Sequence, residues 1–179
     1  MSTNSPLQFR KATPSDTPQV QSLIEAAFQA DDTRPNWTAA VELNRSFRLP
    51  TAVVESLINS PDSAFLIATS SADGSLVGVV GVTKRSPDLG RILHLAIDQK
   101  YQRGGLGRHI LAYAEQYCRD TWGVGRIGLD ALCTRVELIK WYERRGYVRT
   151  GETSPFPAER VKELVLPEGL HFVELEKGV

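Results

Sequence analysis

A glycine-rich stretch follows an apolar run in the middle of the chain: Gln102-Arg103-Gly104-Gly105-Leu106-Gly107-Arg108. An apolar helix face begins at Leu106, so the glycines stand where a strand turns into a helix. The first turn of a helix carries unpaired N–H groups and the positive end of the helix dipole, and glycine lets phosphates approach the backbone. Arg103 and Arg108 add positive charge. The pattern predicts an anion-binding loop, although a tight turn without a ligand would show the same residues.

Two common phosphate-binding motifs do not match this loop. A P-loop needs a Lys followed by Ser or Thr after its last glycine, and neither pair follows Gly107. The dinucleotide fingerprint needs a third glycine at the position that Ile110 occupies. The loop is therefore expected to bind an anion of another kind.

The elements that must position the loop are predicted from apolar periodicity and turn residues. Strands are expected at residues 8–11, 64–68, 76–82, 92–97, 127–132 and 171–175. Helices are expected after the capping cluster at residues 13–18, from Pro50, from Leu106 and at residues 136–145. Residues 31–47 show no clear pattern. This order predicts one α/β or α+β domain that spans residues 1–179.

Two motifs in this framework resemble the GCN5-related N-acetyltransferase (GNAT) superfamily. Gln102, Gly105 and Gly107 match its [QR]-x-x-G-x-[GA] signature, and residues 93–101 look like its fourth strand. The later motif, which resembles the family's last helix and the strand after it, is Leu138-Ile139-Lys140-Trp141-Tyr142-Glu143-Arg144-Arg145-Gly146-Tyr147. The resemblance covers roughly residues 63–150 and implies the GNAT fold: a mixed, mostly antiparallel central sheet flanked by helices and splayed between strands four and five.

The resemblance also implies acetyl-coenzyme A (acetyl-CoA) as the co-substrate and no metal. The amides of residues 102–108 would hold the pyrophosphate. The backbone of Leu95 and Ile97 would pair with the pantetheine arm like an added strand, and the Leu95 amide would polarise the thioester carbonyl. Arg135 stands where the family commonly has an asparagine that contacts this arm. It could instead reach a phosphate, a substrate carboxylate or solvent.

Two catalytic roles follow from the same resemblance. Tyr142 matches the tyrosine that protonates the departing thiolate; a core tyrosine with a satisfied hydroxyl is the alternative. The glutamate that serves as base in the histone-acetylating branch is absent, because Arg91 occupies its position. Asp130 matches an acidic strand-five position of the branch that acetylates a ribosomal-protein alanine, and is the first choice as general base. A structurally paired aspartate remains the alternative.

Other residues are weaker candidates for the acceptor side. Glu152 and a chain of waters are alternative routes for the proton. Glu152 lies in a loop, residues 150–157, that resembles a T-G-E-x-x-P-F segment of small acetyltransferases of the family and would line the acceptor side; a chain-reversing surface loop is the alternative. Strand alternation predicts that His94 faces away from Leu93, Leu95 and Ile97. Three acids in the helical region that usually forms the other acceptor wall could select a cationic amine or be merely solvated: Asp31, Asp32 and Glu55.

Composition narrows the class of function. Lys plus Arg and Asp plus Glu number 21 each, so the zero net charge does not favour a nucleic-acid partner. No run of about 18 apolar residues predicts a membrane span. Cys118 and Cys133 lack metal-ligand spacing and are expected to be reduced thiols of a cytoplasmic protein, neither placed to carry an acyl group.

The sequence therefore predicts an acetyl-CoA-dependent N-acetyltransferase with a primary amine as acceptor. A small-molecule amine and direct transfer in a ternary complex are preferred, and family members are often homodimers. A protein N-terminal or lysine acetyltransferase is one alternative. An acyl-CoA-binding sensor without catalysis is another, because the strand-four glutamate is missing.

Overall fold

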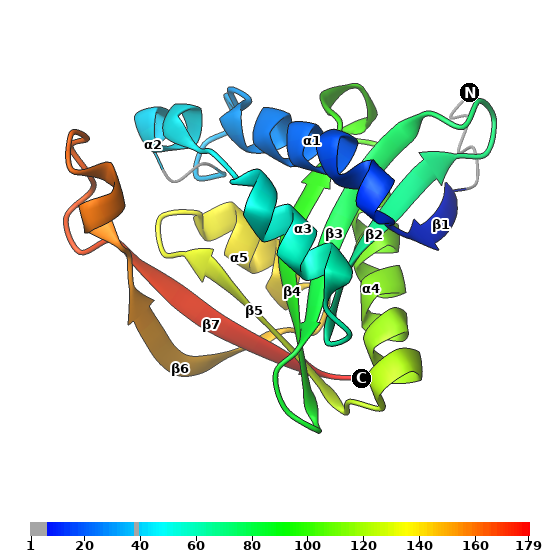
Figure 1. The fold of residues 1–179 in the computed structure, drawn as a ribbon. Helices are drawn as coiled ribbons and strands as arrows, with labels where there is room; N and C mark the ends of the chain where they lie inside the picture. Colours follow the sequence, from blue (N-terminus) through cyan, green and yellow to red (C-terminus); the bar gives the residue numbers. More distant parts are fainter. Residues whose placement is uncertain (1–6, 38–39) are drawn as a thin grey trace.

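The computed structural model describes residues 7–37 and 40–179 and shows one seven-stranded sheet with helices on both faces (Figure 1). The strands, in the spatial order β1-β2-β3-β4-β5-β7-β6, are β1 Leu7–Lys11, β2 Ser63–Ser70, β3 Leu76–Lys84, β4 Leu89–Ile97, β5 Arg126–Leu132, β7 His171–Gly178 and β6 Val148–Pro155. Every neighbouring pair is antiparallel except β4 and β5. The mixed, mostly antiparallel sheet confirms the predicted fold class.

The helices divide between the two faces of the sheet. Their bounds are α1 Thr17–Gln29, α2 Val41–Ser46, α3 Thr51–Asn59, α4 Leu106–Trp122 and α5 Val136–Glu143, with short 3-10 turns at Pro14–Asp16, Gln99–Tyr101 and Ala158–Val161. Helices α1 and α3 lie over β2–β4, and α4 packs against β3 and β4 from the opposite face (Figure 1). None of the described helices is both long and apolar enough to cross a membrane.

Alternation along the central strands creates two hydrophobic cores. In β2, Phe65 and Ile67 join the core under α1 and α3, whereas Leu66 points to the core under α4 and α5. The second core continues beyond β4, because Leu129 of β5 and Leu175 of β7 pack in it. The two cores hold β4 firmly from both sides, which fixes the strand that leads into the glycine loop.

The sheet opens between β4 and β5. Only the beginnings of the two strands pair, with Leu89, Gly90 and Arg91 opposite residues 126–128. Beyond Arg91 the strands diverge, as the splayed arrangement predicts. The part of β4 from Leu93 to Ile97 therefore has β3 as its strand neighbour on one side and an open edge on the other.

The expectation of a loop at residues 150–157 is wrong, because Val148–Pro155 forms the edge strand β6. The strand is almost wholly exposed, so it has no apolar face and leaves no period-two pattern in the sequence. Gly151, with φ +87°, and a register shift between Arg149 and Thr153 interrupt its pairing with β7. Such irregularities are common on edge strands, where they discourage pairing with other chains.

Candidate active site

The glycine loop has the geometry of an anion site. Gly105 is the N-cap of α4 with φ 71° and ψ 12°, and Arg103 also has a positive φ of 70°. In the described part of the chain, no side chain caps the helix and no acid lies in its first turn. The first N–H groups of α4 are therefore free to face a ligand, together with the dipole of a 17-residue helix. This geometry fits the phosphates expected from the sequence.

Close packing holds the loop against β4 and α5. A Cβ atom on Gly107 would lie 3.2 Å from Cδ1 of Ile97 and 3.4 Å from Cζ2 of Trp141. The side-chain amide of Gln102 donates a hydrogen bond of 3.2 Å to the Ile97 carbonyl, which ties the start of the loop back to the strand. The loop, the end of β4 and α5 thus form one continuous surface.

Cations that the sequence did not single out gather beside this surface. The guanidinium of Arg145 lies 3.6 Å over the Trp141 ring and donates to the Trp141 carbonyl at 2.8 Å. Burial lowers the pKa of Arg145, and the positive charges of Arg144 and Arg108 lower it further. The three arginines therefore lie within electrostatic reach of one another and are available to a polyanion. The Arg144-Arg145 pair, which follows Tyr142 within the same motif, was the available signal.

The open edge of β4 contains a bulge at His94, whose φ is 47°. Leu95 and Ile97 pack on the α4 side, as expected, but Leu93 pairs with Gly81 and contacts the Phe65 side of the sheet. His94 also lies there, with its ring 6.3 Å from that of Phe65. The prediction that His94 opposes Leu93 is therefore wrong, because the extra residue of a bulge breaks the alternation.

His94 is a half-buried residue packed beside aromatic side chains in this structure. Its ring also lies 6.4 Å from the ring of Phe28 in α1, and burial lowers the pKa of the imidazole. A neutral histidine packed between two phenylalanines fits a structural role better than that of a base.

Tyr142 lies in α5 with its ring buried between two aromatic neighbours. The side chain is 7% exposed, and its ring meets those of Trp141 and Tyr147 edge to face at 5.1 and 5.7 Å. Burial raises the pKa of Tyr142 to about 12, while the charge of Arg135 opposes this increase. The hydroxyl makes no hydrogen bond with any residue that the structure describes. A core tyrosine with a satisfied hydroxyl is therefore not what the structure shows.

Arg135 is the N-cap residue of α5, and its side chain is held by the segment that follows α1. Its Nε donates a 2.8 Å hydrogen bond to the carbonyl of Trp37, in the segment between α1 and α2. Two residues further, the amide of Glu137 donates to the carbonyl of Asn36 at 3.1 Å. Burial lowers the pKa of Arg135. It is thus a partly buried, oriented side chain rather than a solvated one.

Asp130 belongs to an ion-pair network at the point where β4 and β5 separate. Its carboxylate lies 2.6 Å from Nη2 of Arg91. The two terminal nitrogens of the same guanidinium, Nη1 and Nη2, each lie 3.0 Å from an oxygen of Glu174. Glu174 stands directly opposite Asp130 in the β5–β7 register. Burial and the charge of Glu174 raise the pKa of Asp130, while Arg91 lowers it. Glu174 was not predicted, although its place in the alternation of residues 171–175 was the available signal.

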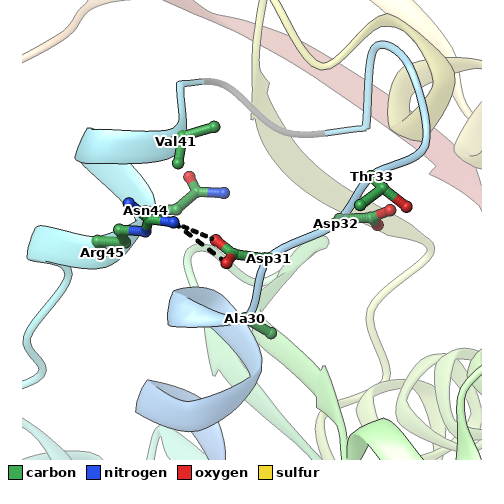
Figure 2. Close-up of a pocket in the computed structure, with 7 residues that line it drawn as sticks. All are labelled: Ala30, Asp31, Asp32, Thr33, Val41, Asn44 and Arg45. Atoms are coloured by element: carbon green, nitrogen blue, oxygen red, sulfur yellow. Dashed lines mark hydrogen bonds and ion pairs between the residues drawn. The ribbon is translucent and has the colours of Figure 1, made fainter.

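The other acidic candidates lie away from this network or are already paired. Glu152 is exposed on β6, two strands beyond β5 in the sheet. Glu55 is exposed on α3. Asp31 is paired with Arg45 at 3.2 Å, and Asp32 lies 2.5 Å from Arg34. Figure 2 draws the Asp31–Arg45 pair. The pocket drawn there, about 270 Å³ in volume, is lined by Ala30, Asp31, Asp32, Thr33, Val41, Asn44 and Arg45. Its two carboxylates are neutralised, so they offer little to select a cationic amine.

A comparison with models of protein families identifies the family of this chain. The model of the acetyltransferase (GNAT) family matches residues 20–147, which is more than half of the chain. The chain belongs to the GNAT family. It is an N-acetyltransferase that uses acetyl-CoA as co-substrate, and the positive-φ glycine loop, the free helix amides and the nearby arginines fit that molecule's phosphates.

Solved structures share the GNAT fold over nearly the whole chain. The ribosomal-protein-S18-alanine N-acetyltransferase from Escherichia coli is 14% identical with a TM-score of 0.72, covering 97% of this chain and 94% of that one. The PaiA N-acetyltransferase from Thermoplasma acidophilum, in complex with coenzyme A, is 16% identical with a TM-score of 0.71, covering 97% and 99%. The spermidine/spermine N-acetyltransferase SpeG from Vibrio cholerae is 14% identical with a TM-score of 0.65, covering 98% and 94%. No curated protein sequence matches the chain.

Replacing Gly105 with alanine in this GNAT enzyme is expected to weaken acetyl-CoA binding about tenfold, because a residue with a Cβ costs about 1–2 kcal/mol at the positive φ that the binding conformation of the loop requires. A Cβ there would meet only the flexible Arg108 side chain, so the effect comes from backbone strain rather than from a clash. Calorimetric titration with coenzyme A measures the change. Gly74→Ala is the matched control, because Gly74 has the same φ of 71° in the β2–β3 turn. An equal loss of affinity in both variants would contradict the assignment of the loop.

Proposed function

We propose that this enzyme acetylates the primary amine of a small molecule by direct transfer within a ternary complex. The observation that carries the proposal is the placement of Tyr142 and Asp130 on opposite faces of β5. Tyr142 packs with Leu129 and Ala131 in the core under α5, and alternation directs Asp130 to the other face. Protein groups can thus contact the attacking amine and the departing thiolate on two sides of the same acetyl group.

The roles of the side chains follow from these positions. Asp130 accepts a proton from the amine as the nitrogen bonds to the acetyl carbon. Tyr142 donates a hydrogen bond to the sulfur as the carbon–sulfur bond breaks. The open edge of β4 from Leu93 to Ile97 offers backbone groups to the pantetheine arm, and the amides of residues 102–108 bind the pyrophosphate.

The cysteines support direct transfer rather than an acyl-enzyme route. Cys118 is fully buried in α4, and burial raises the pKa of its thiol to about 12, so no thiolate forms at neutral pH. Cys133 follows β5, and its amide is bonded to the carbonyl of His171, which ties this position to the sheet. Neither residue lies on the open edge of β4.

The segment that lies over the acceptor side favours a small molecule rather than a protein as the acceptor. The segment after α1 is bonded to the start of α5 at two points, through Trp37 to Arg135 and through Asn36 to Glu137. These bonds hold the segment after α1 against the start of α5, the helix that carries Tyr142. An extended peptide needs an open groove along its backbone, whereas a small amine needs only a pocket.

Thiol release from acetyl-CoA, measured with matched panels of amines, tests the proposal. The panels are free amino acids, polyamines, and peptides with either a free N-terminus or a lysine, and mass spectrometry identifies each acetylated product. Turnover of small amines at least tenfold above that of peptides is expected. Preference for a peptide would establish a protein acetyltransferase instead. Tight coenzyme A binding without turnover of any amine would establish the non-catalytic sensor.

A further inference from the structure

The guanidinium of Arg135 lies within electrostatic reach of Tyr142. It stands seven residues before Tyr142, which is close to two helical turns, so the two side chains leave the same face of α5. Helical side chains lean toward the N-terminus, and this directs the Tyr142 hydroxyl toward Arg135. The hydrogen bond from Nε to the Trp37 carbonyl fixes the plane of the guanidinium and leaves its two terminal nitrogens for another partner.

No carboxylate of the protein neutralises this arginine. Among the described residues, none of the ion pairs within 4 Å includes Arg135, and residues 1–6, 38 and 39 contain no Asp or Glu. The acid whose charge it feels, Asp32, is held by both Nε and Nη2 of Arg34 at 2.9 and 2.5 Å. A buried, oriented cation without a counterion is costly to a fold. It is also what a binding site for a planar anion requires, since guanidinium binds carboxylate with two parallel hydrogen bonds.

The position of Arg135 favours an anion of the acceptor over a phosphate of coenzyme A. Trp37 follows α1, which covers the face of the sheet opposite to α4, whereas the glycine loop leads into α4 and, among the described residues, reaches the segment after α1 only through the charge that Arg103 exerts on Asp32. The loop already has Arg103, Arg108 and the helix amides for phosphates. Arg135 therefore reaches toward the acceptor.

The network around Asp130 supplies the opposite charge. Two carboxylates, those of Asp130 and Glu174, pair with the guanidinium of Arg91, so this ion-paired group carries one net negative charge, which Arg85 offsets only from a longer distance. Tyr142 lies within electrostatic reach of both this network and Arg135. The site thus has a negative group and a positive group that both act on the Tyr142 hydroxyl.

We propose that the acceptor is a small zwitterion, an amino acid or a close analogue, whose carboxylate binds Arg135 while its amine faces Asp130. The proposal rests on the proposed acetyltransferase function and names its substrate class. A polyamine would bring a second cation against Arg135. A peptide N-terminus would bring a neutral amide to the place of the carboxylate.

Matched substrates and two variants test the proposal. Each amino acid is compared with its amide and with the amine that lacks the carboxylate. The wild-type enzyme is expected to favour the amino acid at least tenfold in kcat/KM. Arg135→Gln should lower kcat/KM for the amino acid about 30-fold or more, in the range found for removing one partner of a buried charge pair, and change that for the amide less than about threefold. Arg135→Lys should keep part of the preference, because lysine keeps the positive charge but cannot form the two parallel hydrogen bonds of a guanidinium. Arg119→Gln removes an exposed charge from α4 and should change none of these ratios.

Binding measurements separate this proposal from the one on which it rests. Calorimetry follows the amino acid binding to the coenzyme A complex, and coenzyme A binding alone, in both the wild type and Arg135→Gln. Loss of amino-acid affinity with unchanged coenzyme A affinity supports the proposal even if turnover is absent, in which case only the acetyltransferase mechanism fails. A loss of coenzyme A affinity with an unchanged acceptor preference assigns Arg135 to a phosphate and overturns it. A wild-type preference for polyamines, amides or peptides also overturns it.

Discussion

Replacing Tyr142 with phenylalanine is expected to lower kcat about 100-fold, the lower end of what a positioned proton donor contributes. The substitution removes one oxygen and keeps the ring that packs between Trp141 and Tyr147. Because the hydroxyl has no hydrogen-bond partner among the described residues, its loss leaves no unsatisfied group in the protein. The melting temperature and the affinity for coenzyme A should therefore stay close to those of the wild type, and the loss should appear in kcat.

The raised pKa of Tyr142 decides how the hydroxyl acts. At about 12 it lies above the ordinary thiol value of about 8.5, so full transfer of the phenol proton to a thiolate is unfavourable. A hydrogen bond to the developing negative charge on sulfur is the favourable contribution. Tyr142 stays protonated through the physiological range, and it adds no limb to the pH–rate profile below about pH 10.

Tyr113→Phe provides the matched control for this loss. Tyr113 lies in α4 with its ring stacked on Phe9 at 4.2 Å, away from α5 and the open edge of β4. The control should retain wild-type kcat. If Tyr142→Phe kept kcat within threefold of the wild type under conditions where chemistry limits the rate, Tyr142 would not be the donor to sulfur.

The sequence predicted those parts of the fold whose residues carry a local pattern. The central strands alternate or are wholly apolar, and the glycine loop combines a left-handed N-cap at Gly105 with close packing at Gly107, both of which restrict the residue type. Strand β6 has neither property. It lies at the edge of the sheet and is exposed on both faces. The strand forms through pairing with β7, and its residues show no period-two pattern.

The candidate site was only partly predictable, because its contacts join residues far apart in the chain. Arg91 reaches Asp130 across 39 positions and Glu174 across 83, and Arg135 reaches Trp37 across 98. From sequence, Arg91 marks the absence of a glutamate. In the structure it organises two carboxylates. Similarly, the sequence leaves open whether Arg135 reaches a phosphate, a substrate carboxylate or solvent. Its surroundings, which come from the distant segment after α1, distinguish these alternatives.

Replacing Asp130 with asparagine is expected to lower kcat/KM about 100-fold at neutral pH, the scale of general-base catalysis. The variant should fold, because Arg91 keeps both hydrogen bonds to Glu174. A base acts in its ionised form, so wild-type activity should fall as the pH falls through the pKa of Asp130. That pKa is raised by burial and by Glu174, and the acidic limb should lie above the ordinary range of an aspartate.

Alkaline pH separates a base from a merely structural aspartate. A free amine loses its own proton near pH 10, and above that value the reaction needs a base less. The deficit of Asp130→Asn should therefore shrink as the pH rises from 7 toward 10. A deficit of constant size over this range would indicate that Asp130 only positions Arg91.

Glu174→Gln is the matched variant that assigns the roles within the network. Glu174 raises the pKa of Asp130, so its neutralisation should move the acidic limb to lower pH while costing less than tenfold in kcat/KM. Arg91 would then pair with Asp130 alone, which lowers that pKa further. A larger loss in Glu174→Gln than in Asp130→Asn, with disappearance of the limb, would make Glu174 the base and Asp130 the residue that positions it.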